Sequence, residues 1–110
     1  MFEERQGLNS TDKNSAQAAS GPLFALGQVV ATPGALHTLE QAGESPLRLL
    51  GRHAFGDWGD LDEEDLKSND EALRSEGRLL SAYRLETGQK VWIITEWDRS
   101  QTTLLLPSEY

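Results

Sequence analysis

The sequence contains one histidine in a setting that suggests acid-base chemistry. His53 is preceded by Arg52 and followed four positions later by Asp57. In a catalytic interpretation, His53 is a general base that Asp57 orients, and Arg52 holds an anion. In a structural interpretation, Arg48, Arg52 and His53 place positive charge at the C-terminus of a helix, where the helix dipole favours it. No serine or threonine in a nucleophile-elbow pattern accompanies the pair, so the structural interpretation is favoured.

A second candidate group lies near the end of the chain. Arg99 and Ser100 occupy a predicted hairpin turn, and Thr102 enters the following strand. Small ribonuclease toxins also combine helices with an antiparallel sheet and use Arg, His and Ser/Thr to bind and cleave RNA. If the chain is an enzyme, its catalytic residues are therefore expected to be His53, Arg99 and Thr102. Phosphates attract basic proteins, and the net charge of −8 argues against this activity.

The segment GDWGDLDEED, residues 56–65, holds six carboxylates and a tryptophan in ten positions. A calcium-binding loop would need a glycine at its sixth position. A loop that starts at Asp60 has Asp65 there, and a loop that starts at Asp57 has Asp62 there. The spacing therefore does not match a calcium loop. No metal and no cofactor is expected, because no other residue pattern requires one.

Helix capping explains several of these acids. If Asp62 is the N-cap of a helix, Asp65 is its N3 residue, and Leu61 and Leu66 occupy the two positions of a hydrophobic staple. The carboxylates of the first turn are then stabilised by the helix dipole. We expect this helix to continue through Leu73, with Arg74 in its last turn, and to stop at Gly77.

The position of the charge also suggests a partner. Residues 57–71 contain eight acids and one base, so this segment carries −7 of the net −8. A local negative field attracts a basic protein surface and repels nucleic acid phosphates, so direct nucleic-acid binding is not expected. Trp58 is interpreted either as an anchor for the partner or as a plug at the edge of the core. The predicted partner-binding residues are Asp57, Trp58, Asp60, Glu63, Glu64 and Asp65.

The elements that would position these residues follow from periodicity and capping signals. Residues 1–22 have the composition of a disordered tail, and residues 23–110 of one small domain. A first strand is predicted over 24–32, and helices over 33–42 and 46–54 start at Thr32-Pro33 and Ser45-Pro46. The side chains expected to point inward from these two helices are Ala35, Leu36, Leu39, Ala42, Leu47, Leu50 and Ala54.

After Gly77 the pattern changes to that of strands. RLLSAYRL, KVWIITEW and TTLLL are separated by the turn-like ETGQ and DRSQ, which predicts a three-stranded antiparallel meander. The fold class is therefore α+β in the order β-α-α-α-β-β-β, with the helices on one face of the sheet. The central strand alternates Val91, Ile93 and Thr95 with Trp92, Ile94 and Glu96, so both faces of the sheet are expected to be largely covered.

Composition narrows the class of protein. A chain of 110 residues that is 37% hydrophobic and 25% charged has room for one core. It contains no cysteine, which excludes disulfides, thiolate nucleophiles and cysteine-ligated metals. The first residues lack the apolar stretch of a signal peptide, and no apolar run approaches the length of a membrane span. A cytoplasmic location away from the membrane is therefore expected.

Four motifs carry a resemblance to a known family. LGQVVATPGAL, RHAFGDWGDLDEEDLKSNDEAL, GRLLSAYRL and VWIITEWDRSQTTLLLPSEY resemble small bacterial proteins found on plasmids and integrated elements. Members are labelled plasmid-related proteins or type I restriction endonuclease subunit M, and the resemblance covers residues 24–110. It implies an accessory role for a mobile element without implying a reaction. The chain is too short for a methyltransferase domain and lacks that enzyme's Asn-Pro-Pro tetrapeptide.

These observations favour a non-enzymatic interaction protein of a mobile element. It would bind a basic protein surface and could act as a DNA mimic against a host defence protein. The alternatives are the ribonuclease-like toxin, or another hydrolase that uses His53 and Arg99, and a structural or regulatory dimer. The chain is expected to be a monomer or a homodimer.

Overall fold

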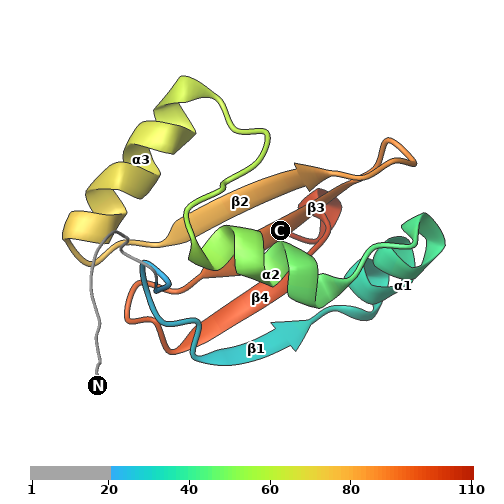
Figure 1. Cartoon of the computed structure of the whole chain (residues 1–110), viewed down its shortest axis with the longest axis horizontal. Helices are drawn as coiled ribbons and strands as arrows, with labels where there is room; N and C mark the ends of the chain where they lie inside the picture. The colour runs from blue at the N-terminus through green and yellow to red at the C-terminus, as the bar shows by residue number, and fades with distance from the viewer. Residues whose placement is uncertain (1–20) are drawn as a thin grey trace, which may run out of the picture.

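The computed structural model of the protein describes residues 21–110. The tail predicted over residues 1–22 therefore lies outside the described residues, apart from its last two. The chain forms an α+β fold (Figure 1). Its elements are β1 (Gln28–Ala31), α1 (Pro33–Ala42), α2 (Pro46–Ala54), α3 (Glu63–Arg74), β2 (Leu79–Arg84), β3 (Lys90–Thr95), β4 (Gln101–Leu105) and the 3₁₀ helix η1 (Pro107–Glu109).

The sheet has four strands in the order β1-β4-β3-β2. β2 pairs with β3, and β3 with β4, in antiparallel fashion, as the predicted meander requires, but β1 pairs with β4 in parallel. The meander prediction was therefore incomplete, because the sheet is mixed. The register sets Gln28 opposite Gln101, so the pairing joins residues more than seventy positions apart. The three helices and the β2–β3 hairpin lie between these two strands in the chain, and they supply the long connection that a parallel pairing needs.

Helices α1 and α2 lie over one face of the sheet, whereas α3 lies beyond its β2 edge (Figure 1). The prediction that all three helices pack on one face of the sheet therefore holds for α1 and α2 but not for α3. The main core lies between the sheet and the first two helices. Its buried side chains are Ala35, Leu39, Leu49, Leu50, Tyr83, Leu85, Val91, Ile93 and Leu104.

The bounds of α1 and α2 agree with prediction, but their buried faces differ from it. Thr32 caps α1 by accepting a hydrogen bond from the Ala35 N–H at 3.0 Å, whereas Ser45 makes no side-chain capping bond to α2. Leu36 and Leu47, predicted to point inward, are 48% and 78% exposed. In α2 the buried positions are instead Leu49, Leu50, His53 and Ala54. Leu50 and Ala54 are buried as predicted, and His53 joins them in the core, where Ser81 and Thr95 of the sheet supply its hydrogen-bond partners.

Helix α3 covers the outer edge of β2. The Asn69 side chain donates to the Leu80 carbonyl at 2.8 Å and accepts from the Leu80 N–H at 3.1 Å. Farther along the strand, Ala82 exchanges backbone bonds with Trp58 and Asp60. An edge strand whose outward N–H and C=O groups are paired no longer presents a template for another strand. Arg74 lies in the last turn of α3, as predicted, but the helix ends there and not at Gly77, because the backbone at Ser75 is already extended.

The other face of the sheet is only partly covered. The chain after β4 turns through η1, and Tyr110 packs edge-to-face on Trp92 with ring centroids 5.6 Å apart. On this face Ala82 and Ile94 are buried, whereas Leu80 and Trp92 are half-buried, so the expectation that both faces are largely covered is met only in part. No helix within residues 21–110 is long and apolar enough to cross a membrane.

Candidate functional site

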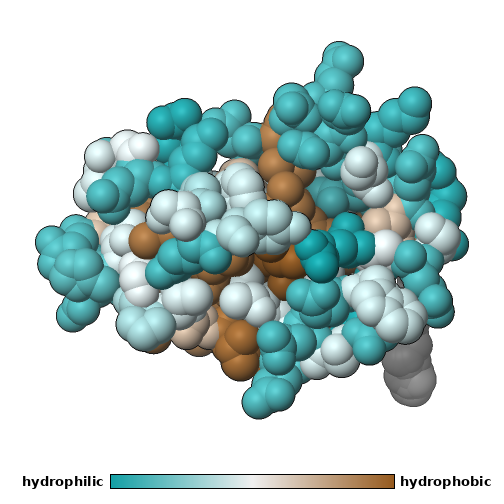
Figure 2. All heavy atoms as spheres, turned by 180° about the vertical axis from the view of Figure 1, so that it is seen from behind, coloured by the Kyte–Doolittle hydropathy of each residue, from teal (hydrophilic) through white to brown (hydrophobic). Residues whose placement is uncertain are grey.

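A groove of about 600 Å³ runs across the sheet face that lies opposite α1 and α2. Figure 2 views the molecule from that side, where a strip of hydrophobic side chains is flanked by hydrophilic ones. The floor is apolar and comes from β2 and β3. The residues that line the groove are Asp60, Leu61, Asp62, Asp65, Arg78, Leu80, Ala82, Lys90, Trp92, Ile94 and Tyr110.

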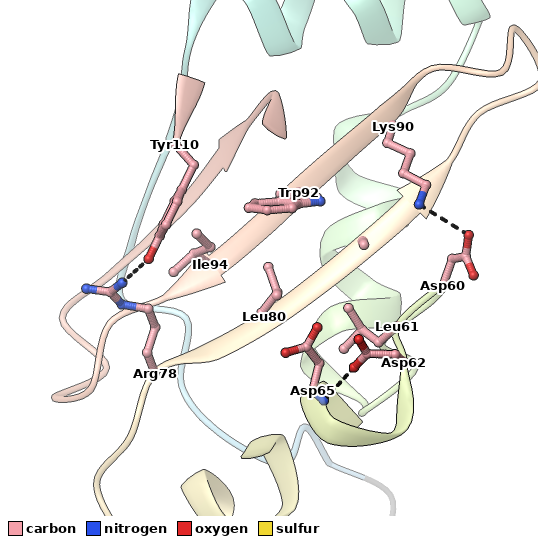
Figure 3. A pocket seen from close by; sticks show the side chains of 11 residues that line it. Asp60, Leu61, Asp62, Asp65, Arg78, Leu80, Lys90, Trp92, Ile94 and Tyr110 are labelled. Atoms are coloured by element: carbon pink, nitrogen blue, oxygen red, sulfur yellow. Dashed lines mark hydrogen bonds and ion pairs between the residues drawn. The ribbon is translucent and has the colours of Figure 1, made fainter. Parts of the chain in front are cut away.

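One wall of the groove is aromatic. Alternation along β3 directs Trp92 away from the core, since its neighbours Val91 and Ile93 are fully buried on the other face. Tyr110 stands beside Trp92, and its hydroxyl accepts a hydrogen bond from the Arg78 guanidinium at 2.6 Å (Figure 3). This bond and the edge-to-face contact hold the phenol at one end of the groove.

The opposite wall is acidic and is the start of α3. Asp62 is the N-cap, as predicted, and its Oδ1 accepts from the Asp65 N–H at 2.9 Å. The Asp65 carboxylate points toward Leu80 and so into the groove (Figure 3). Glu63 and Glu64 continue the same turn and are exposed. Leu66, the predicted staple residue, is 39% exposed.

The basic side chains in and beside the groove are engaged in ion pairs. Lys90 and Arg84 each lie 3.5 Å from the Asp60 carboxylate. Arg78 lies 3.6 Å from Glu96 in addition to its bond with the tyrosine hydroxyl. The carboxylates of Asp62 and Asp65 belong to none of the ion pairs among the described residues. The acidic wall is therefore the part of the groove with uncompensated charge.

Two of the predicted partner-binding residues have other roles. Trp58 is 7% exposed and packs against Ala72 and Leu79 in a second small core cluster. Its ring stacks on Phe24 and meets His53 edge-on, with centroids 6.1 and 5.6 Å apart. The hypothesis of Trp58 as a partner-facing anchor is corrected, since the plug interpretation describes its position.

Asp57 faces away from the groove and pairs with Arg52. The guanidinium donates from Nε at 2.7 Å and from a terminal nitrogen at 3.2 Å, and this holds the pKa of the Asp57 carboxyl below its usual range. The same guanidinium lies over the Tyr83 ring, 4.5 Å from its centroid. A second, shallower concavity of about 360 Å³ opens here, beside Asp60 and Arg84. Because its acids and arginines pair with one another, it offers no net charge to a ligand.

His53 lies in the last turn of α2 together with Arg52, as the structural interpretation expects, but it is fully buried. Its ring does not bond to Asp57. Nδ1 lies 2.6 Å from the Ser81 hydroxyl, and Nε2 lies 2.9 Å from the Thr95 hydroxyl. Burial lowers its pKa to about 4, so the ring is neutral near pH 7 and contributes no positive charge to the end of α2.

The hydrogen-bond chain continues to Thr102 and has one direction. The Thr102 hydroxyl donates to the Leu26 carbonyl at 2.7 Å, because a carbonyl can only accept. Its 2.7 Å bond with Thr95 must then be donated by Thr95, which in turn accepts from His53 Nε2–H. The unprotonated nitrogen of the neutral ring is therefore Nδ1, which accepts a hydrogen bond from the Ser81 hydroxyl.

Ser81 and His53 have the spacing of a nucleophile and its base, but neither is accessible. Both are 0% exposed, and no residue of this chain of hydrogen bonds lines either concavity described above. Burial of polar side chains is tolerated here because each finds a partner. The arrangement is that of a satisfied polar layer in a core.

Arg99 is a structural crosslink. Its guanidinium donates to the carbonyls of Ala72, at 2.8 Å, and Gly77, and also reaches the carbonyls of Glu96 and Trp97. It thereby ties the end of α3 to the β3–β4 turn. His53 and Thr102 are joined through Thr95, whereas the guanidinium of Arg99 bonds backbone carbonyls. Among the described residues, His53, Arg99 and Thr102 therefore do not meet at one accessible pocket.

Sequence reasoning missed Trp92 and Tyr110 as site residues. The signal was present in the alternation of β3, where Trp92 and Ile94 share a face that the two hairpin helices do not cover. Within residues 21–110, no group of three or more His, Asp or Glu side chains is placed to hold a metal ion. Comparison with family models, with curated proteins and with solved structures gives no match to this chain.

Proposed function

We propose that this chain is a non-enzymatic interaction protein that binds a basic surface of a protein partner. The binding surface is the acidic start of α3, formed by Asp60, Asp62, Glu63, Glu64 and Asp65. The observation that carries this proposal is the position of these acids beside an apolar groove. Interfaces combine an apolar centre with a polar rim, and charge complementarity at the rim directs the encounter.

Helix capping does not explain all of the negative charge at the start of α3. One carboxylate, that of Asp62, makes the capping bond. The dipole stabilises each of the other first-turn acids by only about 0.3 to 1 kcal/mol, and adjacent carboxylates repel one another. An acidic partner-binding surface accounts for keeping Glu63, Glu64 and Asp65 together.

The resemblance to proteins of plasmids and integrated elements supports an accessory role for a mobile element. On this proposal, the partner is a basic host protein, and the acidic surface occupies a site that would otherwise bind DNA phosphates. Direct binding of nucleic acid is not proposed, because the same carboxylates repel phosphates.

Affinity capture from host lysate tests the proposal. The parent chain is compared with a Glu63→Gln/Glu64→Gln/Asp65→Asn variant and with an Asp70→Asn/Glu71→Gln/Glu76→Gln variant of equal net charge. We expect a basic protein to be recovered with the parent and the second variant only, in a salt-sensitive manner. Equal recovery with all three chains, after each has been shown to melt cooperatively, would contradict an acidic binding surface.

The alternatives are weaker on this geometry. A ribonuclease-like toxin needs His53 and Arg99 at one accessible pocket, and these residues instead bind a buried threonine and backbone carbonyls. A structural or regulatory dimer makes a different prediction, namely twice the mass of the monomer in solution, which light scattering measures.

A further inference from the structure

Resting on the function proposed above, we infer that the groove on the uncovered sheet face receives an arginine side chain of the partner. The aliphatic part of that arginine lies over Leu80 and Trp92, and its guanidinium reaches the carboxylates of Asp62 and Asp65. The inference assigns to the partner a specific recognition element, an arginine flanked by apolar residues.

The shape of the groove fits a long side chain with an apolar stem. Leu80, Ala82 and Ile94 form a floor without polar side chains, and the Trp92 indole forms the wall (Figure 3). Arginine buries its methylene groups along such surfaces while its charged end stays at the rim.

The charges around the groove select a cation over an anion. Asp60 is paired with Lys90 and Arg84, and Arg78 is engaged by Tyr110 and Glu96. The charge left to meet a ligand is therefore that of Asp62 and Asp65. An anion in the groove would face both carboxylates, whereas a cation would neutralise them.

The geometry favours arginine over lysine. Asp62 spends Oδ1 on the helix cap and has Oδ2 available, and Asp65 directs its carboxylate into the groove. A planar guanidinium presents several donors at once and can bond both carboxylates. It is also more weakly hydrated than an ammonium group, which suits a site with an apolar floor.

A nuclear magnetic resonance titration tests this inference with defined probes. The full chain, labelled with nitrogen-15, is titrated to millimolar concentration with an acetylated and amidated pentapeptide that carries one arginine flanked by leucines. The matched probe has citrulline, a neutral analogue of the same shape, in place of arginine. The indole N–H signals of Trp92 and Trp97 are assigned with Trp92→Phe and Trp97→Phe variants.

We expect the arginine peptide to shift the Trp92 indole signal and to leave that of Trp97, at the β3–β4 turn, in place. Loss of the charged hydrogen bonds should weaken binding of the citrulline peptide by roughly tenfold. An Asp62→Asn/Asp65→Asn variant should show a similar loss. Asparagine still caps a helix, so this variant keeps the start of α3.

Three results would overturn the inference. Equal shifts with both peptides would show that the charge is not recognised. Shifts confined to the amides of α3, without Trp92, would place a basic ligand on the acidic surface but outside the groove, and would leave the proposed function standing. An absence of shifts with either peptide at millimolar concentration would remove the arginine site, while capture from lysate would still decide the proposed function.

Discussion

The Nε2 atom of His53 lies 2.9 Å from the Thr95 hydroxyl oxygen, and this bond joins α2 to the central part of the sheet. It belongs to a chain of hydrogen bonds that runs from Ser81 to the Leu26 carbonyl. Because that carbonyl fixes the direction of every donor, the histidine must be neutral with its proton on Nε2. His53, the residue that the sequence marks for acid-base chemistry, thus has a structural role, since it links α2 to the sheet.

The first prediction concerns the pH dependence of stability. The pKa of His53 is lowered to about 4 in the folded chain, from about 6.5 when unfolded. Above pH 6.5 both states are neutral, and the free energy of unfolding is unaffected. As the pH is lowered from 6.5 to 4, the His53 imidazole takes up a proton only in the unfolded state. The free energy of unfolding therefore decreases on acidification, by about 3 kcal/mol at most. Urea unfolding at a series of pH values measures this.

A His53→Gln variant is the control for that experiment. Glutamine does not titrate, so the variant should be less stable at pH 7 but should lack the loss between pH 6.5 and 4. The lowered pKa values of the Asp57 and Glu109 carboxyls are common to parent and variant, so the stability that these two groups lose as the pH falls cancels in the comparison. Parallel pH profiles for parent and variant would show that His53 does not control this window.

The second prediction concerns the end of the same chain. Thr102→Val removes the hydroxyl that donates to the Leu26 carbonyl and accepts from Thr95. It leaves buried polar groups without partners, and the free energy of unfolding should fall by about 1 to 3 kcal/mol. Thr103→Val, on the opposite face of the same strand, should change it by less than about 0.5 kcal/mol. Chemical denaturation that gave equal losses for the two variants would refute the role of the network.

The third prediction concerns Arg99. Arg99→Lys keeps the charge, and neither residue relieves the positive φ of 61° at this position. An ammonium group cannot bond the carbonyls of Ala72, Gly77 and the turn at once, so the variant should lose about 1 to 3 kcal/mol. Arg74→Lys, at an exposed position, is the matched control. Hydrogen exchange at the end of α3 should quicken in the Arg99 variant alone.

Local signals predicted the elements of this fold well. Thr32-Pro33 and Ser45-Pro46 predicted the starts of two helices, and Asp62 the cap of the third. These signals act over three or four residues, so a single sequence contains them. The pairing of β1 with β4 was missed because it depends on contacts between Gln28 and Gln101, which no local pattern records.

The site was less predictable for a related reason. Capping chemistry identifies the acids at the start of α3, but the sequence leaves Trp58 open between an anchor and a plug, and it assigns no role to Trp92. Both tryptophans have apolar and polar neighbours in the sequence. Only the placement of the helices decides that Trp58 packs on His53 while Trp92 faces the groove. The choice between them therefore depends on tertiary packing.

The fourth prediction separates the two roles of Asp62. The carboxylate caps α3 through Oδ1, and we propose that it also meets a basic partner. Asparagine keeps the capping oxygen but not the charge, whereas alanine removes both. Asp62→Ala should therefore lower the free energy of unfolding by about 0.5 to 2 kcal/mol, and Asp62→Asn should leave it nearly unchanged.

Partner recovery should follow charge and not stability. Each variant is compared with the parent by thermal melting and by capture of the basic partner in the same buffer. If the acidic surface recognises the partner, Asp62→Asn should melt like the parent yet recover less of it, and Asp62→Ala should recover no more than Asp62→Asn. If Asp62→Asn captures the partner as well as the parent does, the Asp62 charge serves the helix alone. The recognition surface would then have to be sought among Glu63, Glu64 and Asp65.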